Sequence, residues 1–189
     1  MRFILIALFG FIASHFTVGA YAAPYTIDPA HTYPYFEINH LGFSTMRGRF
    51  DKTSGKLTMD LAKKTGSVDI TIDAASISTA HTKRDKHLRS PDFLNAAEYP
   101  TITFKSSKVT FTSDTTITVV GNLTITGVTK PVTLKVTNIV CGNNPYNKKP
   151  QCGFDAHTSF KRSDFGVKYG LPGIGDEMKI NFEVEAYKD

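Results

Sequence analysis

The sequence predicts a mainly β protein, an antiparallel barrel or sandwich of about eight strands that carries one short helical insert. Three observations predict this fold: apolar and polar residues alternate with a period of two, threonine and other β-branched residues are frequent, and the connections are short. Short connections favour antiparallel neighbours. A length of 189 residues with 41% hydrophobic residues fits a single domain.

The N-terminus is typical of a secretory signal peptide over residues 1–22. An apolar run of 11 residues from Phe3 to Ala13 is too short to span a bilayer, and Ala20-Tyr21-Ala22 fits a cleavage signal. We expect cleavage before Ala23, which leaves one domain over residues 23–189. The leader predicts export of the mature protein, and since no later stretch is apolar enough to span a membrane, no integral membrane anchor is expected.

The alternation predicts which side chains face the interior. Each strand has an apolar and a polar face, so the apolar faces of neighbouring strands meet inside. A turn is expected at Ser106-Ser107, and Gly121 is expected to interrupt a long strand. In chain order, the positions on the inner face are Phe36, Ile38 and His40; Leu57, Met59 and Leu61; Val68, Ile70 and Ile72; Ile102 and Phe104; Val109 and Phe111; Ile117, Val119, Leu123 and Ile125; Val132, Leu134 and Val136; Phe154, Ala156 and Phe160; and Met178, Ile180, Phe182, Val184 and Ala186.

One segment breaks the β pattern and predicts a helix. Thr82 is expected as the N-cap, with Asp85 in the first turn and Leu88 at helical spacing. Ser90-Pro91 ends this helix, because the residue before a proline is disfavoured in the α region, and Phe93 supplies an apolar contact in the next turn. A short helix in a β chain needs a surface to cover, so we expect it over the open end of the barrel or sandwich.

Charge and motifs exclude several classes of function. The formal charge of +5 comes from scattered basic residues without an aromatic platform, so no nucleic-acid partner is predicted. The sequence contains no G-x-S-x-G, Walker, GxGxxG or HExxH motif. His81 and His87 lie near Asp85, but their spacing supplies no further metal ligand. We therefore predict no catalytic residues, no metal and no cofactor.

Two cysteines flank a loop-like run. Cys141 and Cys152 enclose Gly142 to Gln151, which is rich in asparagine, lysine and proline. An even cysteine count in an exported protein predicts a disulfide, which stabilises a small loop by roughly 3 kcal/mol in the chain-entropy model.

Arg162 shares the inner phase of Phe154 and Phe160, so its guanidinium is expected in an apolar setting that requires an anion. One interpretation is an ion pair with Asp85, Asp92 or Asp164 that fixes the helical insert. The other is an anchor for the headgroup of a ligand, and both can hold together.

Four stretches of the sequence carry a resemblance. They are Asp28-Pro29-Ala30-His31 with Phe36, His40 and Gly48; Arg84-Asp85-x-His87-Leu88-x-Ser90-x-Asp92-Phe93 with Tyr99-Pro100 and Phe104; Gly121-x-Leu123-Thr124-x-x-Gly127-Val128-Thr129 with Val132 and Leu134; and Lys161-Arg162-x-Asp164-Phe165-Gly166. In their order and spacing they resemble the YceI-like family of bacterial periplasmic proteins, over almost the whole mature chain. Two features depart from the family pattern: Thr32 stands where serine is usual, and the loop between the cysteines is additional.

The resemblance implies an extended, lipocalin-like β-barrel, partly closed by the helical insert. It implies binding of a polyisoprenoid chain, such as a quinone or polyprenyl lipid, or another long-chain amphiphilic lipid, and it implies no enzyme. A rival interpretation is a structural or stress-related barrel filled by its own side chains, and a homodimer is left open. The residues that we expect to contact the ligand are Phe36, Ile38, His40, Phe50, Val68, Ile70, Ile72, Arg84, Leu88, Phe93, Phe104, Leu123, Ile125, Phe160, Arg162, Phe165, Ile180 and Phe182.

Overall fold

A computed structural model describes residues 22–189, and the expected signal peptide lies almost wholly outside this range. The strands are β1 (Ala23–Ile27), β2 (Tyr33–His40), β3 (Ser44–Phe50), β4 (Thr53–Asp60), β5 (Thr65–Asp73), β6 (Ile77–Ser78), β7 (Thr101–Phe111), β8 (Ile117–Ile125), β9 (Val128–Asn143), β10 (Pro150–Lys161) and β11 (Glu177–Lys188). The helical elements are α1 (Thr82–Leu88) and the 3₁₀ turns η1 (Ala74–Ser76) and η2 (Arg162–Phe165).

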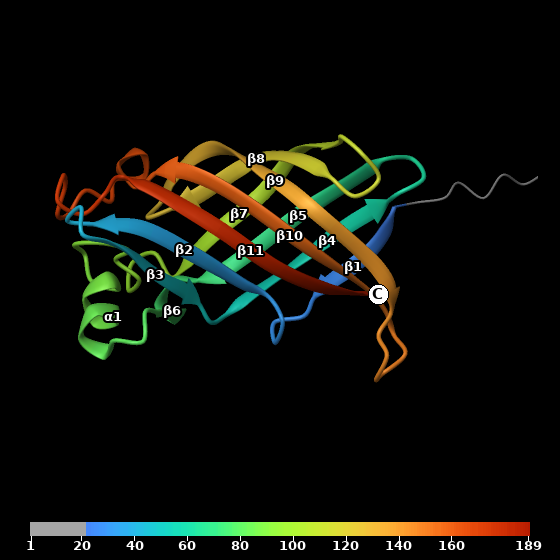
Figure 1. Ribbon diagram of the computed structural model, residues 1–189, viewed down its shortest axis with the longest axis horizontal. Coiled ribbons are helices and arrows are strands. Elements are labelled where there is room, and N and C mark those ends of the chain that lie inside the picture. Colours follow the sequence, from blue (N-terminus) through green and yellow to red (C-terminus); the bar gives the residue numbers. More distant parts are fainter. Residues whose placement is uncertain (1–21) are drawn as a thin grey trace, which may run out of the picture.

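The strands form a closed antiparallel barrel, which confirms the predicted fold class (Figure 1). The ring runs β1-β4-β5-β7-β8-β9-β10-β11 and closes because β11 also pairs with β1. Strands β2, β3 and β6 extend the sheet from β11 at one end. The alternation places apolar side chains inside, and β11 follows the prediction along its length, with Ile180, Val184 and Ala186 buried.

Two strands share one edge of β11. Strand β2 pairs with Lys179–Glu183, and β1 pairs with Ala186–Lys188. Glu185 lies between these pairings, and on this edge its backbone forms hydrogen bonds with the connection between β1 and β2. The N–H of Asp28 donates to the Glu185 carbonyl at 2.8 Å, and the buried Thr32 hydroxyl accepts from the Glu185 N–H at 3.2 Å. A threonine therefore satisfies this junction with the same hydroxyl that a serine would supply.

Three local predictions within the strands are wrong. Leu61, expected on the inner face, follows the end of β4 and is exposed. Ser106-Ser107 forms no turn, because β7 is continuous there and only shifts register at a bulge, where the Ser106 hydroxyl accepts from the Val68 N–H at 2.8 Å. Gly121 does not interrupt β8 either. A Cβ at this position would collide with the Phe104 ring and the Lys105 carbonyl, so glycine lets the aromatic ring lie across the strand.

The helical insert lies beside β3 and β6 at one end of the barrel, as predicted (Figure 1). Its N-cap is His81 rather than Thr82, since His81 Nδ1 accepts from the Arg84 N–H at 3.2 Å. Asp85 is buried and accepts from the Thr79 N–H at 2.9 Å instead of closing a capping box. Among residues 22–189, no helix has the length and apolar character needed to cross a bilayer.

The other end of the barrel carries the long β9–β10 hairpin, whose tip projects from the sheet (Figure 1). Cys141 and Cys152 are directly opposite each other in this hairpin, with a Cα–Cα distance of 4.1 Å, and they form the predicted disulfide. The run between them is partly strand rather than loop, because β9 continues to Asn143 and β10 begins at Pro150.

Candidate functional site

A cavity of about 350 Å³ lies inside the barrel at the end that carries the insert, and it is partly open to solvent. We call this end the mouth. Nearly all of the cavity wall is apolar. The expected site residues on this wall are Phe36, Ile38, His40, Phe50, Ile70, Ile72, Arg84, Leu88, Phe93, Phe104, Leu123, Ile125, Phe160, Arg162, Phe165, Ile180 and Phe182. Their contact with a ligand stays a prediction.

A second, smaller cavity of about 70 Å³ lies deeper in the barrel. Val68, one of the expected ligand contacts, lines this second cavity instead, because β5 runs away from the mouth toward its N-terminal end. Three side chains line both cavities: Ile70, Leu134 and Phe182. The two cavities therefore adjoin each other at the level of these side chains.

Sequence reasoning missed several lining residues for an identifiable reason. Those in regular strands, such as Val132, Leu134 and Met178, lie on the predicted inner face and were only left out of the expected ligand contacts. Others come from segments without periodicity, where no sequence signal fixes their direction. These are Ile77, Thr79, Leu94, Val167, Tyr169 and Ile174.

Arg162 is buried, with 5% of its surface exposed, but its partners are not the predicted ones. Its guanidinium donates to three backbone carbonyls: those of Gly175 at 2.8 Å, Ile174 at 3.0 Å and Val167 at 3.1 Å. Burial lowers the pKa of Arg162, although the nearby charge of Asp176 opposes this effect. Arg162 therefore fixes the 166–176 loop against the end of β10.

The predicted ion pair between Arg162 and the insert is wrong. The chain leaves the strand at Lys161 and turns into η2, which directs the guanidinium to its own loop. Asp85 binds Thr79, and Asp92 lies 2.7 Å from His87 Nε2, so the two carboxylates of the insert already have partners. Asp164, the third candidate, is exposed.

The insert is fixed to the mouth by its own polar contacts. Arg84 donates from Nε to the Thr79 hydroxyl at 2.7 Å and from its terminal nitrogen to the Thr79 carbonyl at 2.9 Å. The His87 ring lies edge-on to Phe93 and to Tyr169, at centroid distances of 5.0 and 5.1 Å. This aromatic group joins the insert to the 168–174 loop, and both segments border the mouth.

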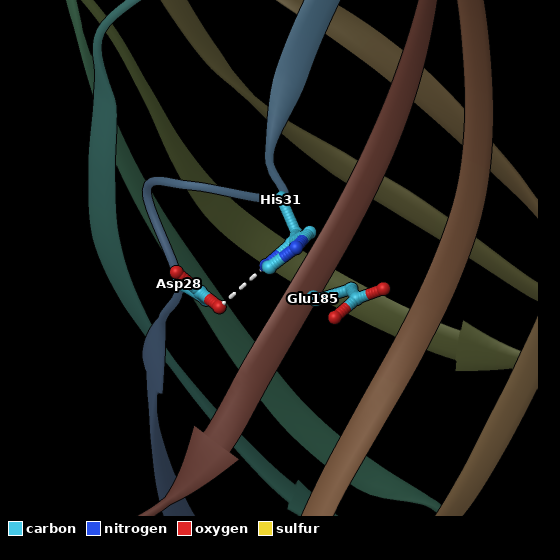
Figure 2. A group of neighbouring side chains, drawn as sticks. All are labelled: Asp28, His31 and Glu185. Atoms are coloured by element: carbon cyan, nitrogen blue, oxygen red, sulfur yellow. Dashed lines mark hydrogen bonds and ion pairs between the residues drawn. The ribbon is translucent and has the colours of Figure 1, made fainter. Parts of the chain in front are cut away.

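A group of titratable side chains lies outside the cavity, at the junction of β1, β2 and β11. Figure 2 shows the His31 ring directed at Asp28, with an Nδ1–Oδ2 distance of 2.8 Å, while the carboxylate of Glu185 points away. Partial burial disfavours the charged form of Asp28, but hydrogen bonds from His31 and Ala30 outweigh it and lower the pKa of Asp28. The hydrogen bond to Asp28, followed by the charges of Asp28 and Glu185, raises the pKa of His31.

These three residues offer ligand atoms within 4.8 Å of one another, which is a spacing that a metal ion could use. The contacts favour a structural junction instead. Both Asp28 oxygens accept hydrogen bonds, from Ala30 and His31, and Glu185 accepts one from Gln151. A cation would have to replace this network, which holds the point where β11 passes from one partner strand to the other.

A closed antiparallel barrel with an apolar cavity at one end defines a class of small β-barrel proteins whose interior can hold a ligand. Within that class the chain belongs to the YceI-like family, because the YceI-like domain matches residues 25–186. It is 41% identical over 179 residues to a UPF0312 protein of Pseudomonas aeruginosa, covering 92% of each chain. It is also 41% identical over 179 residues to Protein YceI of Escherichia coli O6:H1, covering 93% of each chain.

Solved structures share the fold. BcnA of Burkholderia cenocepacia is 29% identical with a TM-score of 0.74, and the match covers 84% of this chain and 98% of that one. A polyisoprenoid binding domain from Saccharophagus degradans, implicated in plant cell wall breakdown, has a TM-score of 0.66 over 89% of this chain and 100% of that one. At 16% identity the second likeness concerns the fold alone.

Proposed function

We propose that this protein is an exported bacterial lipid-binding protein that holds a polyisoprenoid chain, of a quinone or a polyprenyl lipid, for transport or storage. The observation that carries the proposal is the apolar cavity of about 350 Å³ at the mouth of the barrel. The role is binding rather than catalysis.

The energetics favour a long apolar ligand. A prenyl chain exposes hundreds of square ångströms in water, and its burial is worth roughly 25 cal/mol per Å². The charged side chains on the cavity wall, Arg84 and Arg162, already donate to groups of the protein itself. Apolar contact therefore supplies most of the proposed affinity. The name of the S. degradans neighbour points to the same ligand class.

Export is proposed from the N-terminal sequence. Residues 1–22 have the pattern of a cleaved leader, and the Cys141–Cys152 disulfide fits an oxidising compartment such as the periplasm. Fractionation of the native host, with mass spectrometry of the mature N-terminus, should place the protein in the periplasm with Ala23 first. A chain that retains Met1 in the cytoplasm would contradict this part of the proposal.

The ligand is tested by organic extraction of protein purified from its native host, followed by mass spectrometry. We expect a prenyl lipid in a fixed ratio to the protein. A matched pair of double variants on β11 locates it. Met178→Trp with Ile180→Trp fills the cavity and should remove most of the lipid. Lys179→Trp with Asn181→Trp places the same bulk on the outer face and should leave it.

A native protein without extractable lipid would favour the rival role, a structural or stress-related barrel. Equal lipid in both double variants would show that the lipid binds outside the cavity.

A further inference from the structure

Three segments lie around the mouth, and one of them, the 168–174 loop, contacts the other two. They are the 41–43 turn between β2 and β3, the insert at 82–94, and the 168–174 loop, which we together call the rim (Figure 1). The Leu41 N–H donates to the Gly173 carbonyl at 2.8 Å, which joins the turn to the loop. Tyr169 of the loop packs on His87 and Phe93 of the insert.

The rim exposes large apolar side chains. Of the six exposed large hydrophobic residues among residues 22–189, three belong to the rim: Phe43 at 91%, Leu41 at 53% and Tyr169 at 51% exposed. Exposed hydrophobic residues gathered at one place indicate an interaction site, whereas single ones need no explanation. Tyr169 also lines the cavity, and Leu41 is bonded to the same loop, so these exposed apolar groups lie beside the cavity opening.

The conformation of the 41–43 turn supports a role outside folding. Leu41 and Gly42 have φ values of 55° and 76°, and the Phe43 N–H donates to the His40 carbonyl at 3.0 Å, as in a type I′ hairpin. Such a turn favours asparagine or glycine at its first central position, and a leucine there is strained. The chain thus places an exposed leucine where a polar residue would fit the backbone better.

The rim is also positively charged. Lys83, Lys86 and Lys168 are exposed, and no carboxylate among the described residues 22–189 forms an ion pair with them. The carboxylates of the insert are already engaged, Asp85 with Thr79 and Asp92 with His87. Exposed apolar groups next to unpaired lysines match the interface of a bilayer that contains anionic lipids.

We propose that the rim docks on the surface of an anionic lipid bilayer, with Leu41, Phe43 and Tyr169 entering the interface and the lysines contacting headgroups. The inference rests on the proposed function, because a bilayer is the store from which a prenyl chain would enter the cavity. Docking by the mouth lets the chain pass between bilayer and barrel without crossing water.

The test is vesicle co-sedimentation with protein that begins at Ala23, so that the apolar leader plays no part. Every strand of the barrel lies within this chain. Vesicles are made of phosphatidylcholine alone or of phosphatidylcholine and phosphatidylglycerol in equal parts. We expect binding to the anionic vesicles, and weaker binding as the salt concentration rises.

The decisive variant is Leu41→Asn with Phe43→Ser. Asparagine suits the turn, so the melting temperature should stay or rise, while binding should fall roughly tenfold or more with the loss of two apolar side chains. Tyr146→Ser is the matched control, because Tyr146 is 93% exposed at the tip of the opposite hairpin and should not affect binding. Lys83→Gln, Lys86→Gln and Lys168→Gln each remove one positive charge and should each weaken binding by roughly fivefold.

Equal binding by the rim variant and wild type, or equal loss with Tyr146→Ser, would overturn the proposal. So would a rim variant that only converts a dimer to a monomer in light scattering, since the rim would then pair two copies of this chain. Extraction of the same preparation separates the two proposals: lipid in the cavity without vesicle binding refutes docking alone, and vesicle binding by protein that never contains lipid refutes the carrier role.

Discussion

The two ends of this barrel are closed in different ways. At the far end, a regular β-hairpin carries the disulfide, and the adjacent interior leaves only about 70 Å³ empty. At the mouth, about 350 Å³ is empty, and the covering segments are a short helix, turns and a loop held by hydrogen bonds. Hydrogen bonds break and re-form reversibly at ambient temperature, whereas opening a disulfide requires a reductant or a thiol. The comparison indicates that the far end is held closed covalently, whereas the segments at the mouth can move to admit a ligand.

Removing the hydrogen bonds of Arg162 at the mouth should have the largest effect on the free energy of unfolding. Arg162→Met leaves three carbonyls of the 166–176 loop without their donor, and we expect the free energy of unfolding to fall by about 4 kcal/mol. Urea denaturation measures this loss, and amide exchange should accelerate first within the loop. Lys161→Met, at the exposed neighbouring position, should change little. An unaltered midpoint for Arg162→Met would show that other contacts hold the loop.

Breaking the far end should cost somewhat less and leave the ligand in place. Replacing Cys141 and Cys152 with serine removes a crosslink between residues 11 apart in sequence, which stabilises by about 3 kcal/mol in the chain-entropy model. Denaturation midpoints with and without reductant measure the effect on wild type, and the double variant should not respond to reductant. Lipid content should match wild type, and a large loss of lipid would mean that the two ends are coupled.

The boundary between the two cavities can be altered by a single substitution. Phe182→Leu shortens one of the three side chains that line both cavities and should lower stability by roughly 1 kcal/mol. The extracted lipids should shift toward longer chains, which mass spectrometry resolves. Phe154→Leu is the matched control, because Phe154 lines only the deeper cavity. Identical chain-length distributions in both variants would exclude Phe182 as a limit on ligand length.

The smallest expected effect concerns Asp28 and His31 at the junction of β1, β2 and β11, whose contribution to the stability of the fold should depend on pH. The pKa of His31 is raised above 6.5, so its contribution is lost as the pH rises through the folded-state value. The pKa of Asp28 is lowered below 3.8, so its contribution is lost as the pH falls through the folded-state value. The pair therefore stabilises most between pH 3.8 and 6.5.

Melting temperatures measured from below pH 3.8 to above pH 6.5 should show a shallow maximum within this window, and His31→Gln should flatten it. Replacing the exposed His157 with glutamine should keep the maximum. If His31→Gln retains the wild-type profile, the pair does not contribute to stability.

The sequence predicts the barrel wall well because alternation in a strand is a local property with a fixed period. Ile180 and Phe104 face inward for that reason alone. It predicts short or polar strands poorly: β3, with Thr45, Arg47 and Arg49, lacks a continuous apolar face and was not foreseen. Burial of Arg162 followed from its phase, but its partners did not. Backbone carbonyls look alike in every sequence, so no pattern indicates which three of them will receive a guanidinium.

The seam that closes the barrel joins Tyr25 near the start of the folded chain to Lys188 near its end. Contacts so distant in sequence carry a large loop-closure entropy and form late, so we expect folding to be slow relative to helical proteins of this size. Until β11 is in place, β1 and β10 each present an unpaired edge that can template association with another chain. For as long as that seam is open, the chain is most exposed to aggregation.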